Sequence, residues 1–285
     1  MTALTLADSL AQAESRLKDG PHPERARQDA ECLLCHLLGK NRAWLLAHRD
    51  AGLDHAQLEI YERMSTRRLA GEPMQHITGE AEFYGLPFSV NREVLIPRPE
   101  TEHLVEKTLE LAAPWGAPRI ADVGTGSGAI AVALARHLPA AAIAAVDISE
   151  TALDVARKNA NRNLAGSRIR FRSGDLLAPF HGETFELIVS NPPYVPESDR
   201  DSLAVEVRDY EPARALFAGE DGLAIYRRLI PEAFGALVPG GYILLEIGCG
   251  QRAGVQALLA NAGFASIDFT ADLQGIPRVA SARRA

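Results

Sequence analysis

The amino-acid sequence predicts an α/β protein in which a mostly parallel sheet, covered by helices on both faces, follows a small helical bundle. Three observations lead to this prediction. From Pro118 onward, short apolar runs alternate with helical patterns, as in βαβ units. Before about residue 72, apolar residues recur every three or four positions, as in helices that pack together. Between these regions, residues 82–90 contain two β-prone runs around a Gly-Leu-Pro turn, which is typical of a hairpin.

These patterns divide the chain into three parts. We expect a helical bundle over residues 1–72, used for substrate recognition because it contains nothing that resembles a catalytic set. A hairpin and a proline-rich linker follow over residues 73–100, and the α/β domain covers residues 101–285. Arg98 and Glu100 in the linker either close a surface loop or lie beside a cleft, and the sequence leaves both alternatives open.

Within the α/β domain we expect a sheet of seven strands. The expected strands are residues 119–123, 141–146, 169–173, 185–190, 242–247, 264–269 and 277–281. The expected helices are residues 103–112, 127–137, 149–161, 222–237 and 252–261. Thr101 or Glu100 can start the first of these helices, and Ser149 is a favourable N-cap for the third.

Composition limits the class of protein. A chain of 285 residues is long enough for two domains, and 47% hydrophobic with 24% charged residues is typical of a soluble globular protein. The net charge of −7 argues against duplex DNA or structured RNA as the main partner, because phosphate binding favours a basic excess. No apolar run reaches 18 residues, and Asp8 and Glu14 interrupt the N-terminus, so we expect neither a membrane span nor a signal peptide.

Cys32 and Cys35, followed by His36, have the spacing of half a metal site. They lie in an apolar helical pattern, and no second pair of ligands stands at the spacing of a zinc site. We therefore expect both cysteines to pack in a helical core and expect no metal.

A glycine-rich turn follows the first expected strand. It spans Asp122–Gly128 and has the spacing G-x-G-x-G, whereas the dinucleotide fingerprint is G-x-G-x-x-G. Glycines allow positive φ and close approach of a ligand, and the following helix offers free N–H groups. Asp147 ends the second strand, where its carboxylate is placed to bind both ribose hydroxyls. The turn predicts a cofactor that contains adenosine.

The stretch Asn191-Pro192-Pro193-Tyr194 ends the fourth expected strand. Two prolines give a stiff extended turn, which would hold the Asn191 amide and main-chain carbonyls as fixed acceptors beside the Tyr194 ring. This arrangement suits a planar group that carries NH2. An ordinary proline-rich turn with an exposed tyrosine is the alternative, and these four residues alone do not decide between the two. Together with the glycine-rich turn, they favour S-adenosylmethionine as the cofactor.

The same motifs carry a family resemblance. Asp122–Gly128 is similar to the first cofactor motif of class I methyltransferases, and residues 191–194 resemble their [Asp/Asn/Ser]-Pro-Pro-[aromatic] motif. With the helical N-terminal region, Ile96–Glu102 and residues 210–223, the chain resembles the bacterial peptide chain release factor glutamine methyltransferases. The resemblance covers nearly the whole chain and preserves the order of the motifs.

This resemblance implies a Rossmann-like class I methyltransferase domain. The implied reaction transfers a methyl group from S-adenosylmethionine to the side-chain amide nitrogen of a glutamine, expected in the GGQ motif of a release factor, and leaves S-adenosylhomocysteine. The implied catalytic residues are Asn191, Pro192 and Tyr194, and Pro193 completes the substrate pocket. The enzyme would act as a cytoplasmic monomer without a direct nucleic-acid partner.

The resemblance also assigns the cofactor-binding residues. The methionine part of the cofactor would contact Gly124, Thr125, Gly126, Ser127 and Gly128, and the remainder would contact Asp147 at the ribose, Asp175 and Leu176 at the adenine, and Asn191. The well-known bacterial members have a tryptophan at the position of Leu176. We therefore expect somewhat weaker cofactor binding here, with the leucine contacting the base by apolar packing.

Three alternatives remain at this stage. A nucleic-acid methyltransferase acting on adenine N6 or guanine N2 uses a similar turn to hold a flipped base, but the acidic net charge argues against it. A ribosomal-protein glutamine methyltransferase would have identical chemistry. A module that binds the cofactor or a translation factor without reaction is the third, and the intact cofactor motif together with Asn191 argues against it.

Overall fold

The computed structural model describes residues 4–285, which fold as two units. One unit contains the chain up to Gly79 together with Leu203–Tyr210, and the other contains Glu80–Ser202 and Glu211–Ala285. The limits expected for the domains, at residues 72 and 100, stay a prediction, and residues 1–3 of the expected bundle lie outside the described residues. Within residues 4–285, no helix combines the length and apolar character needed to cross a membrane.

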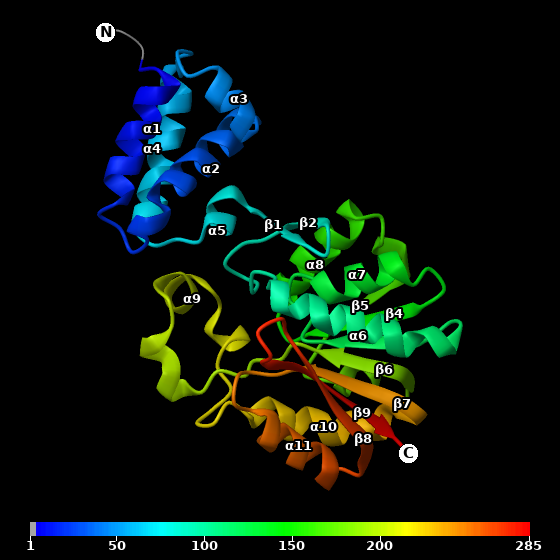
Figure 1. Cartoon of the computed structure of the whole chain (residues 1–285). Helices are drawn as coiled ribbons and strands as arrows, with labels where there is room; N and C mark the ends of the chain where they lie inside the picture. Colours follow the sequence, from blue (N-terminus) through cyan, green and yellow to red (C-terminus); the bar gives the residue numbers. More distant parts are fainter. Residues whose placement is uncertain (1–3) are drawn as a thin grey trace. The chain divides into compact units, whose positions relative to one another are not determined.

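The first unit is helical (Figure 1). Its helices are α1 (Leu6–Leu17), α2 (Ala26–Leu38), α3 (Arg42–Ala47), α4 (His55–Leu69), α5 (Met74–Thr78) and α9 (Val205–Tyr210). Capping boxes at Thr5 and Asp54 start α1 and α4, which satisfies N–H groups that the first helical turn leaves unpaired. Helices α1 to α5 enclose one apolar core, which includes the fully buried side chains of Leu33 and Leu34 on α2.

The two cysteines of α2 differ from one another. Cys35 is partly buried and packs against the core of the helical unit, as expected. Cys32 is exposed, so core packing is wrong for this residue. It precedes the buried Leu33 by one position and therefore points away from the core side of α2.

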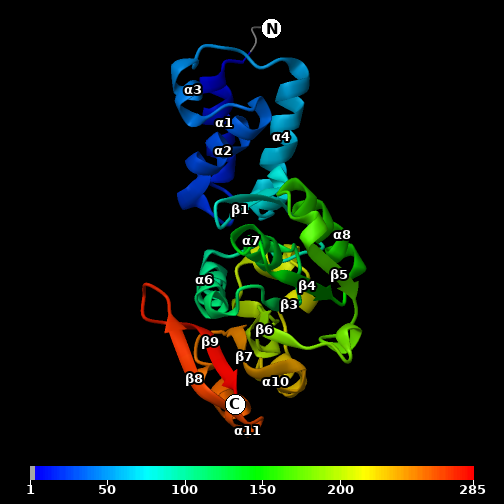
Figure 2. The ribbon, with the colours of Figure 1, turned by 90° about the vertical axis from the view of Figure 1, so that its right-hand side faces the viewer.

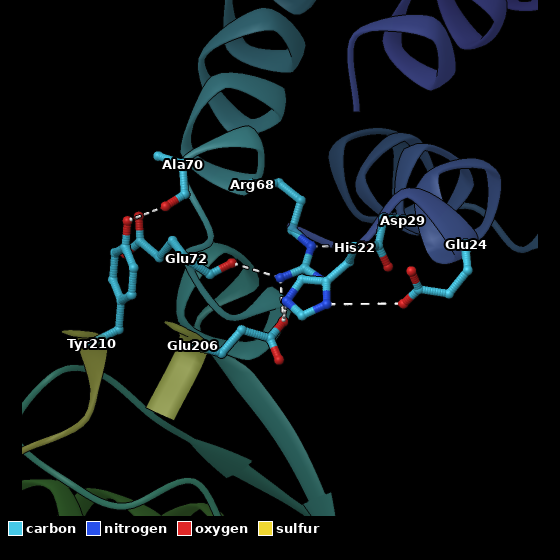
Figure 3. Close-up of polar contacts among 8 residues, drawn as sticks. All are labelled: His22, Glu24, Asp29, Arg68, Ala70, Glu72, Glu206 and Tyr210. Atoms are coloured by element: carbon cyan, nitrogen blue, oxygen red, sulfur yellow. Dashed lines mark hydrogen bonds and ion pairs between the residues drawn. The ribbon is translucent and has the colours of Figure 1, made fainter. Parts of the chain in front are cut away.

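A buried ion network joins Leu203–Tyr210 to the rest of the helical unit (Figure 3). Arg68, at the end of α4, is only 2% exposed. Its Nε donates to Asp29 Oδ2 at 2.5 Å, and its Nη1 donates to the main-chain oxygen of Glu72 at 3.0 Å and to the carboxylate of Glu206. The guanidinium is thus surrounded by acceptors on three segments of this unit.

Two further contacts hold the same segment. The hydroxyl of Tyr210 donates to the main-chain oxygen of Ala70 at 2.9 Å, and His22 Nε2 lies 3.4 Å from Glu206 Oε1 (Figure 3). Sequence analysis gave no indication of this association, because its partners are separated by more than a hundred residues of chain. The contact of Arg68 with Glu206, for example, spans 138 residues.

The second unit contains a two-stranded hairpin and a seven-stranded sheet. The hairpin is β1 (Glu80–Phe83) and β2 (Leu86–Ser89), and the larger sheet has β3 (Arg119–Val123), β4 (Ala142–Asp147), β5 (Ile169–Ser173), β6 (Phe185–Ser190), β7 (Leu237–Glu246), β8 (Phe264–Ala271) and β9 (Pro277–Arg284). The strand order is β5-β4-β3-β6-β7-β9-β8, with β9 antiparallel to both of its neighbours. The expected seven-stranded, mostly parallel sheet is confirmed. Figure 2 shows β5 and β8 at its opposite edges.

Helices cover both faces of this sheet (Figure 1). They are α6 (Glu102–Ala112), α7 (Ala129–His137), α8 (Glu150–Arg162), α10 (Ala224–Ala236) and α11 (Arg252–Asn261). Neighbouring strand residues alternate between two apolar clusters. Ile120 packs with α6 and α7, whereas Ala121 packs with α10 and α11. The parallel strands β3, β4 and β6 are therefore buried on both sides, which explains why they read as short apolar runs, whereas the edge strand β5 is partly exposed.

The hairpin turn and the start of β7 differ from their expected positions. The hairpin turns at Tyr84 and Gly85, both with positive φ, and Pro87 lies inside β2 opposite Glu82 instead of in the turn. A two-residue hairpin needs positive φ at both central positions, and a proline fits a strand that has only one partner. Strand β7 begins at Leu237, before the expected start at residue 242, and its pairing with β6 shifts register between Leu237 and Tyr242.

The strand register positions the site. Val123 of β3 aligns with Val146 of β4 and with Ser190 of β6, and Ser190 aligns with Leu245 of β7. The residues that follow, which include the glycine-rich turn, Asp147, Asn191 and Glu246, therefore meet at the carboxyl edge of the sheet. Ligands bind at this edge in open parallel sheets.

Candidate active site

A cavity of about 310 Å³ opens at the carboxyl edge of the sheet, within the second unit. This volume lies in the range of small-molecule sites. The residues predicted from the sequence that line it are Gly124, Thr125, Gly126, Ser127, Asp147, Asp175, Leu176, Asn191, Pro192 and Pro193. Gly128 and Tyr194 lie beside this set without lining the cavity. The structure therefore brings segments from four strand ends together around one space.

The three glycines of the cofactor motif have different surroundings. Gly124, Gly126 and Gly128 all have positive φ. A Cβ atom built at Gly124 or Gly126 would meet no protein atom within 4 Å, so these two leave room for a ligand against the backbone. A Cβ atom at Gly128 would lie 3.0 Å from that of Ala156 on α8. Gly128 thus permits close packing of helices and does not face the cavity.

Asp147 is fixed at the end of β4 by two main-chain donors. Its Oδ2 accepts from the N–H of Gly126 at 2.8 Å, and its Oδ1 accepts from the N–H of Ser149 at 2.9 Å. Each carboxylate oxygen has a further lone pair for a ligand. The carboxylate is therefore oriented beside the glycine-rich turn and can still accept from a pair of hydroxyls.

Asp122 supports the same turn from inside the protein. Its Oδ2 accepts from Thr125 Oγ1 at 2.6 Å and from the N–H of Ala131 at 3.1 Å. Its Oδ1 has no hydrogen-bond partner among residues 4–285. Burial raises the pKa of this carboxyl to about 7, although the two hydrogen bonds act in the opposite direction.

The residues expected at the adenine lie on the turn after β5. Leu176 lines the cavity, packs against the neighbouring apolar cluster and has a φ of 48°. The carboxylate of Asp175 forms an ion pair with Arg228 of α10, and both side chains are about half exposed. Leu176 thus offers an apolar surface to the cavity, while the carboxylate of Asp175 already has a partner.

The amide of Asn191 has a fixed direction. Its Nδ2 donates to Oγ1 of the buried Thr101 at 3.1 Å, and its Oδ1 has no hydrogen-bond partner within the described part of the chain. Pro192 and Pro193 continue the cavity wall. Asn191 lines the cavity, and its amide oxygen is the kind of acceptor that an NH2 group needs.

Tyr194 lies deeper than its neighbours. Its ring packs against the apolar core, its hydroxyl donates to Glu246 Oε1 at 3.4 Å, and burial raises its pKa above the usual value. Its main-chain oxygen accepts from Gln251 Nε2 at 2.8 Å. These contacts hold the end of the turn, and the role of Tyr194 as a wall for the substrate stays a prediction.

Sequence analysis missed three polar residues behind the turn: Thr101, Glu246 and Gln251. Thr101 was expected to start a helix, but its hydroxyl makes no capping hydrogen bond and instead accepts from Asn191. Glu246 interrupts the apolar run 242–247, and a buried acid in such a run is itself a signal for a site. Gln251 had no comparable signal.

The linker lies against the cavity. Arg98 Nη2 donates to both carboxylate oxygens of the buried Glu211 at 2.7 Å. This ion pair joins two segments whose neighbouring residues, Pro97 and Pro212, both line the cavity. Arg98 and Glu100 do not themselves line the cavity, so a role for either of them beside the cleft stays a prediction.

Comparison with known families adds to this geometry. Residues 8–79 match the family described as the PrmC N-terminal domain, and residues 101–209 match the methyltransferase small domain. Two solved structures share the fold. A methyltransferase from Pyrococcus furiosus is 19% identical with a TM-score of 0.53, covering 71% of this chain and 90% of that one. A 16S rRNA methyltransferase from T. thermophilus, in complex with AdoMet and guanosine, is 18% identical with a TM-score of 0.54, covering 72% and 50%.

Relatives of known name cover the whole chain. A release factor glutamine methyltransferase of Koribacter versatilis is 42% identical over 284 residues, which is 99% of each chain. That of Deinococcus radiodurans is 43% identical over 285 residues, also 99% of each. That of Moorella thermoacetica is 44% identical over 260 residues, or 91% of each. The chain therefore belongs to the release factor glutamine methyltransferase family.

Proposed function

We propose that this protein transfers a methyl group from S-adenosylmethionine to the side-chain amide nitrogen of a glutamine in peptide chain release factors, within their GGQ motif. The single observation that carries the proposal is the position of Asn191, which lines the cavity while its NH2 group donates to Thr101. The names of the full-length relatives support the choice of release factors over ribosomal proteins or nucleic-acid bases.

The residues around the cavity suit S-adenosylmethionine. Gly124 and Gly126 leave space that the methionine part would fill, and the oriented carboxylate of Asp147 would bind the ribose hydroxyls. Leu176, which lines the cavity on the turn after β5, would contact the adenine. Asn191, at the end of β6, would then lie near the transferred methyl group.

The chemistry follows from the weakness of an amide nucleophile. The lone pair of a carboxamide nitrogen is delocalised into its carbonyl. Hydrogen bonds from the two N–H groups of the substrate to Asn191 Oδ1 and the Pro192 main-chain oxygen orient the nitrogen towards the methyl. The nitrogen–carbon bond forms as the carbon–sulfur bond breaks, the sulfonium charge is neutralised, and a proton leaves to water. Alignment of this kind supplies about 7–11 kcal/mol of barrier reduction.

The partner reaches this site as a folded protein. In our proposal the helical unit recognises the release factor, the enzyme acts as a monomer without direct contact to nucleic acid, and the reaction takes place in the cytoplasm. The net charge of −7 supports a protein partner over a nucleic acid, because phosphate neutralisation needs clustered basic residues.

Methyl transfer to separate substrates tests the proposal. The protein is incubated with labelled S-adenosylmethionine and, in parallel, with a release factor, a ribosomal protein fraction and nucleic acid. Mass spectrometry then locates the label, and we expect it on the GGQ glutamine of the release factor. A release factor in which this glutamine is replaced by asparagine is the matched control and should stay unlabelled. Label on ribosomal protein or nucleic acid alone would contradict the proposal.

A further inference from the structure

A buried ion pair stands next to the cavity without lining it. Nη2 of Arg98 donates to both carboxylate oxygens of Glu211 at 2.7 Å. The side chain of Glu211 is 1% exposed and that of Arg98 is 30% exposed. Each of the two residues is followed or preceded by a proline that does line the cavity, Pro97 in one segment and Pro212 in the other. The pair therefore joins two segments of the cavity wall, and it can influence a ligand only through them.

The first of these segments contacts the start of the Asn191–Tyr194 turn. The N–H of Thr101 donates to the main-chain oxygen of Arg98 at 3.1 Å, across the single helical turn Pro99–Thr101. Thr101 is buried, and its hydroxyl accepts from Asn191 Nδ2 at 3.1 Å. The position of Arg98 thus fixes the hydroxyl that holds the Asn191 side chain.

The second segment holds the end of the same turn. The N–H of Val195 donates to the main-chain oxygen of Leu216 at 2.8 Å, and the N–H of Ala218 donates to that of Val195 at 2.9 Å. These two hydrogen bonds form an isolated parallel bridge. A short 3-10 helix, Ala213–Ala215, connects Leu216 to the part of the segment that begins at Glu211. The position of Glu211 thus fixes the strand-like contact of Val195.

Together these contacts make a closed path around the turn, within the second unit. Along this path lie Asn191, Thr101, Arg98, Glu211, Leu216 and Val195. The ion pair is the step that connects the two segments, which are 113 residues apart in the sequence. Pro192 and Pro193 leave the turn itself few conformations, so fixing both of its ends fixes Asn191 at the cavity.

Stability alone does not account for an ion pair at this step. Apolar side chains of similar volume often give equal or greater stability than a buried ion pair. An arginine–carboxylate contact adds a defined direction and distance, which apolar packing lacks. A fixed distance between the two segments is what a turn held at both ends requires.

We propose that Arg98 and Glu211 are positioning residues for methyl transfer, which hold the Asn191–Tyr194 turn in place from both of its ends. This inference rests on the proposed function. A reacting group displaced by about 1 Å loses about 10²-fold in rate, so loosening either end of the turn lowers kcat. The cofactor contacts at the glycine-rich turn and at Asp147 lie outside the path and should keep their strength.

Steady-state kinetics of Glu211→Gln test this role. Glutamine keeps the shape of the side chain but removes its charge, so the contact with Arg98 weakens. We expect kcat for a release factor to fall by about 10²-fold. The dissociation constant of S-adenosylhomocysteine, measured by titration calorimetry, should stay close to that of the wild type. Such a split between turnover and cofactor affinity is not expected from general damage to the domain.

Variants of Arg98 keep the proposal testable if Glu211→Gln folds poorly. Arg98→Met removes the donor at a side chain that is partly exposed, and kcat should fall to a similar degree. Arg98→Lys keeps a cationic donor and should retain more of the activity than Arg98→Met. Combining Arg98→Met with Glu211→Gln should cost no more than the larger single effect, because both variants break the same contact.

Glu186→Gln is the matched control. Glu186 also forms an ion pair within the second unit, with Arg119 at 2.7 Å, and it is mostly buried. This pair lies near the starts of β3 and β6, at the edge of the sheet opposite the cavity. Breaking it should leave kcat close to that of the wild type. An equal fall of kcat in Glu186→Gln and Glu211→Gln would overturn the proposal.

Hydrogen exchange of the unliganded protein separates this inference from the proposed function. The N–H groups of Val195 and Ala218 exchange when the hydrogen bonds at the end of the turn open. In Glu211→Gln both should exchange about tenfold faster or more, as expected when a hydrogen bond between charged groups is lost. The N–H of Gly126, which donates to Asp147, should exchange as in the wild type.

Faster exchange at the end of the turn together with a lower kcat supports the role of the ion pair. Unchanged exchange at Val195 and Ala218, or a kcat that survives the loss of the pair, overturns it. A wild type that labels no release factor counts against the proposed function, and the exchange rates then still report whether the pair holds the turn.

Discussion

The two units bury charge in different ways. In the helical unit, the guanidinium of Arg68 reaches two carboxylates, from Asp29 and Glu206, and one main-chain oxygen. In the sheet unit, Asp122 and Glu246 are equally buried, yet each keeps one oxygen without a hydrogen-bond partner within residues 4–285. Burial raises the pKa of each of these acids to about 7.

This difference separates charges that hold the fold from charges that serve a site. A buried ion with oppositely charged partners fixes how chain segments associate. Removing it leaves the partner charges buried without a counter-ion. A buried carboxyl with too few hydrogen-bond partners lowers stability. Such groups are found where their protonation or the orientation of their oxygens serves a functional site. Asp122 accepts from Thr125 of the glycine-rich turn and Glu246 accepts from Tyr194 at the end of the Asn191 turn, so both acids contact the segments that form one cavity without lining it themselves.

Breaking the compensated network should give the largest effect on stability. Arg68→Ala leaves Asp29 and Glu206 without their shared partner, and it should lower the free energy of unfolding of the helical unit by about 3–5 kcal/mol. Urea denaturation followed by circular dichroism measures this change. The control is Lys18→Ala, which removes an exposed ion pair with Glu14 and should cost at most about 1 kcal/mol. Equal losses in the two variants would mean that burial of Arg68 is unimportant.

Removing the acceptor at the cavity should affect catalysis and leave the fold intact. Asn191→Ala should lower kcat by about 10²–10³, in line with the loss of one polar group that stabilises a transition state. Cofactor affinity from calorimetry should change little, because the glycine-rich turn and Asp147 remain. Gln274→Ala removes an exposed amide outside the cavity and serves as the matched control. Near-normal turnover of Asn191→Ala would remove this residue from the mechanism.

The buried carboxyl of Glu246 should make the stability of the protein depend on pH. The folded pKa of Glu246 lies above its usual value of 4.5, so the folded state binds the proton more tightly than the unfolded state. Its contribution to stability is therefore present below about pH 4.5 and is lost as pH rises towards 7. Glu246→Gln should gain stability relative to the wild type by up to about 3 kcal/mol between pH 5 and pH 8. A difference in unfolding free energy that stays constant over this range would show that Glu246 is not buried as an acid.

The sequence predicted those strands that are set by residues close together in the chain. Strands 119–123 and 185–190 agree with the structure because they are mostly apolar and are bounded by turn residues. Strand 169–173 agrees because Ile169 and Phe171 alternate with polar residues. The hairpin turn was misplaced because positive φ at Tyr84, a residue that rarely adopts it, leaves no trace in the sequence.

Polar contacts between distant segments were not predictable in this way. The glycine-rich turn and Asn191 were identified from motifs, but the contacts of Asn191 with Thr101 and of Tyr194 with Glu246 form only when these segments meet at the carboxyl edge of the sheet. Thr101 also carries a misleading local signal, since threonine before a helix normally caps it. The association of Leu203–Tyr210 with the helical unit depends likewise on contacts made only in the folded chain.

The smallest expected effect concerns the adenine contact. Leu176→Trp should tighten S-adenosylmethionine by about 0.5–1.5 kcal/mol, because an aromatic ring can stack on the base. Leu164→Trp is a matched control, since this leucine also has a positive φ, of 56°, but is exposed outside the cavity. Titration calorimetry compares the two variants with the wild type. Equal affinity in all three would place the adenine away from Leu176.

A crystal structure with S-adenosylhomocysteine and a peptide containing the GGQ motif tests the central claim most directly. We predict that the glutamine amide nitrogen lies about 2.7–3.2 Å from Asn191 Oδ1, with the Asn191 Nδ2 still bound to Thr101 Oγ1. The nitrogen should also face the sulfur of the cofactor. A complex in which the turn points away from the cofactor, or in which Asn191 presents its NH2 to the glutamine, would contradict the account.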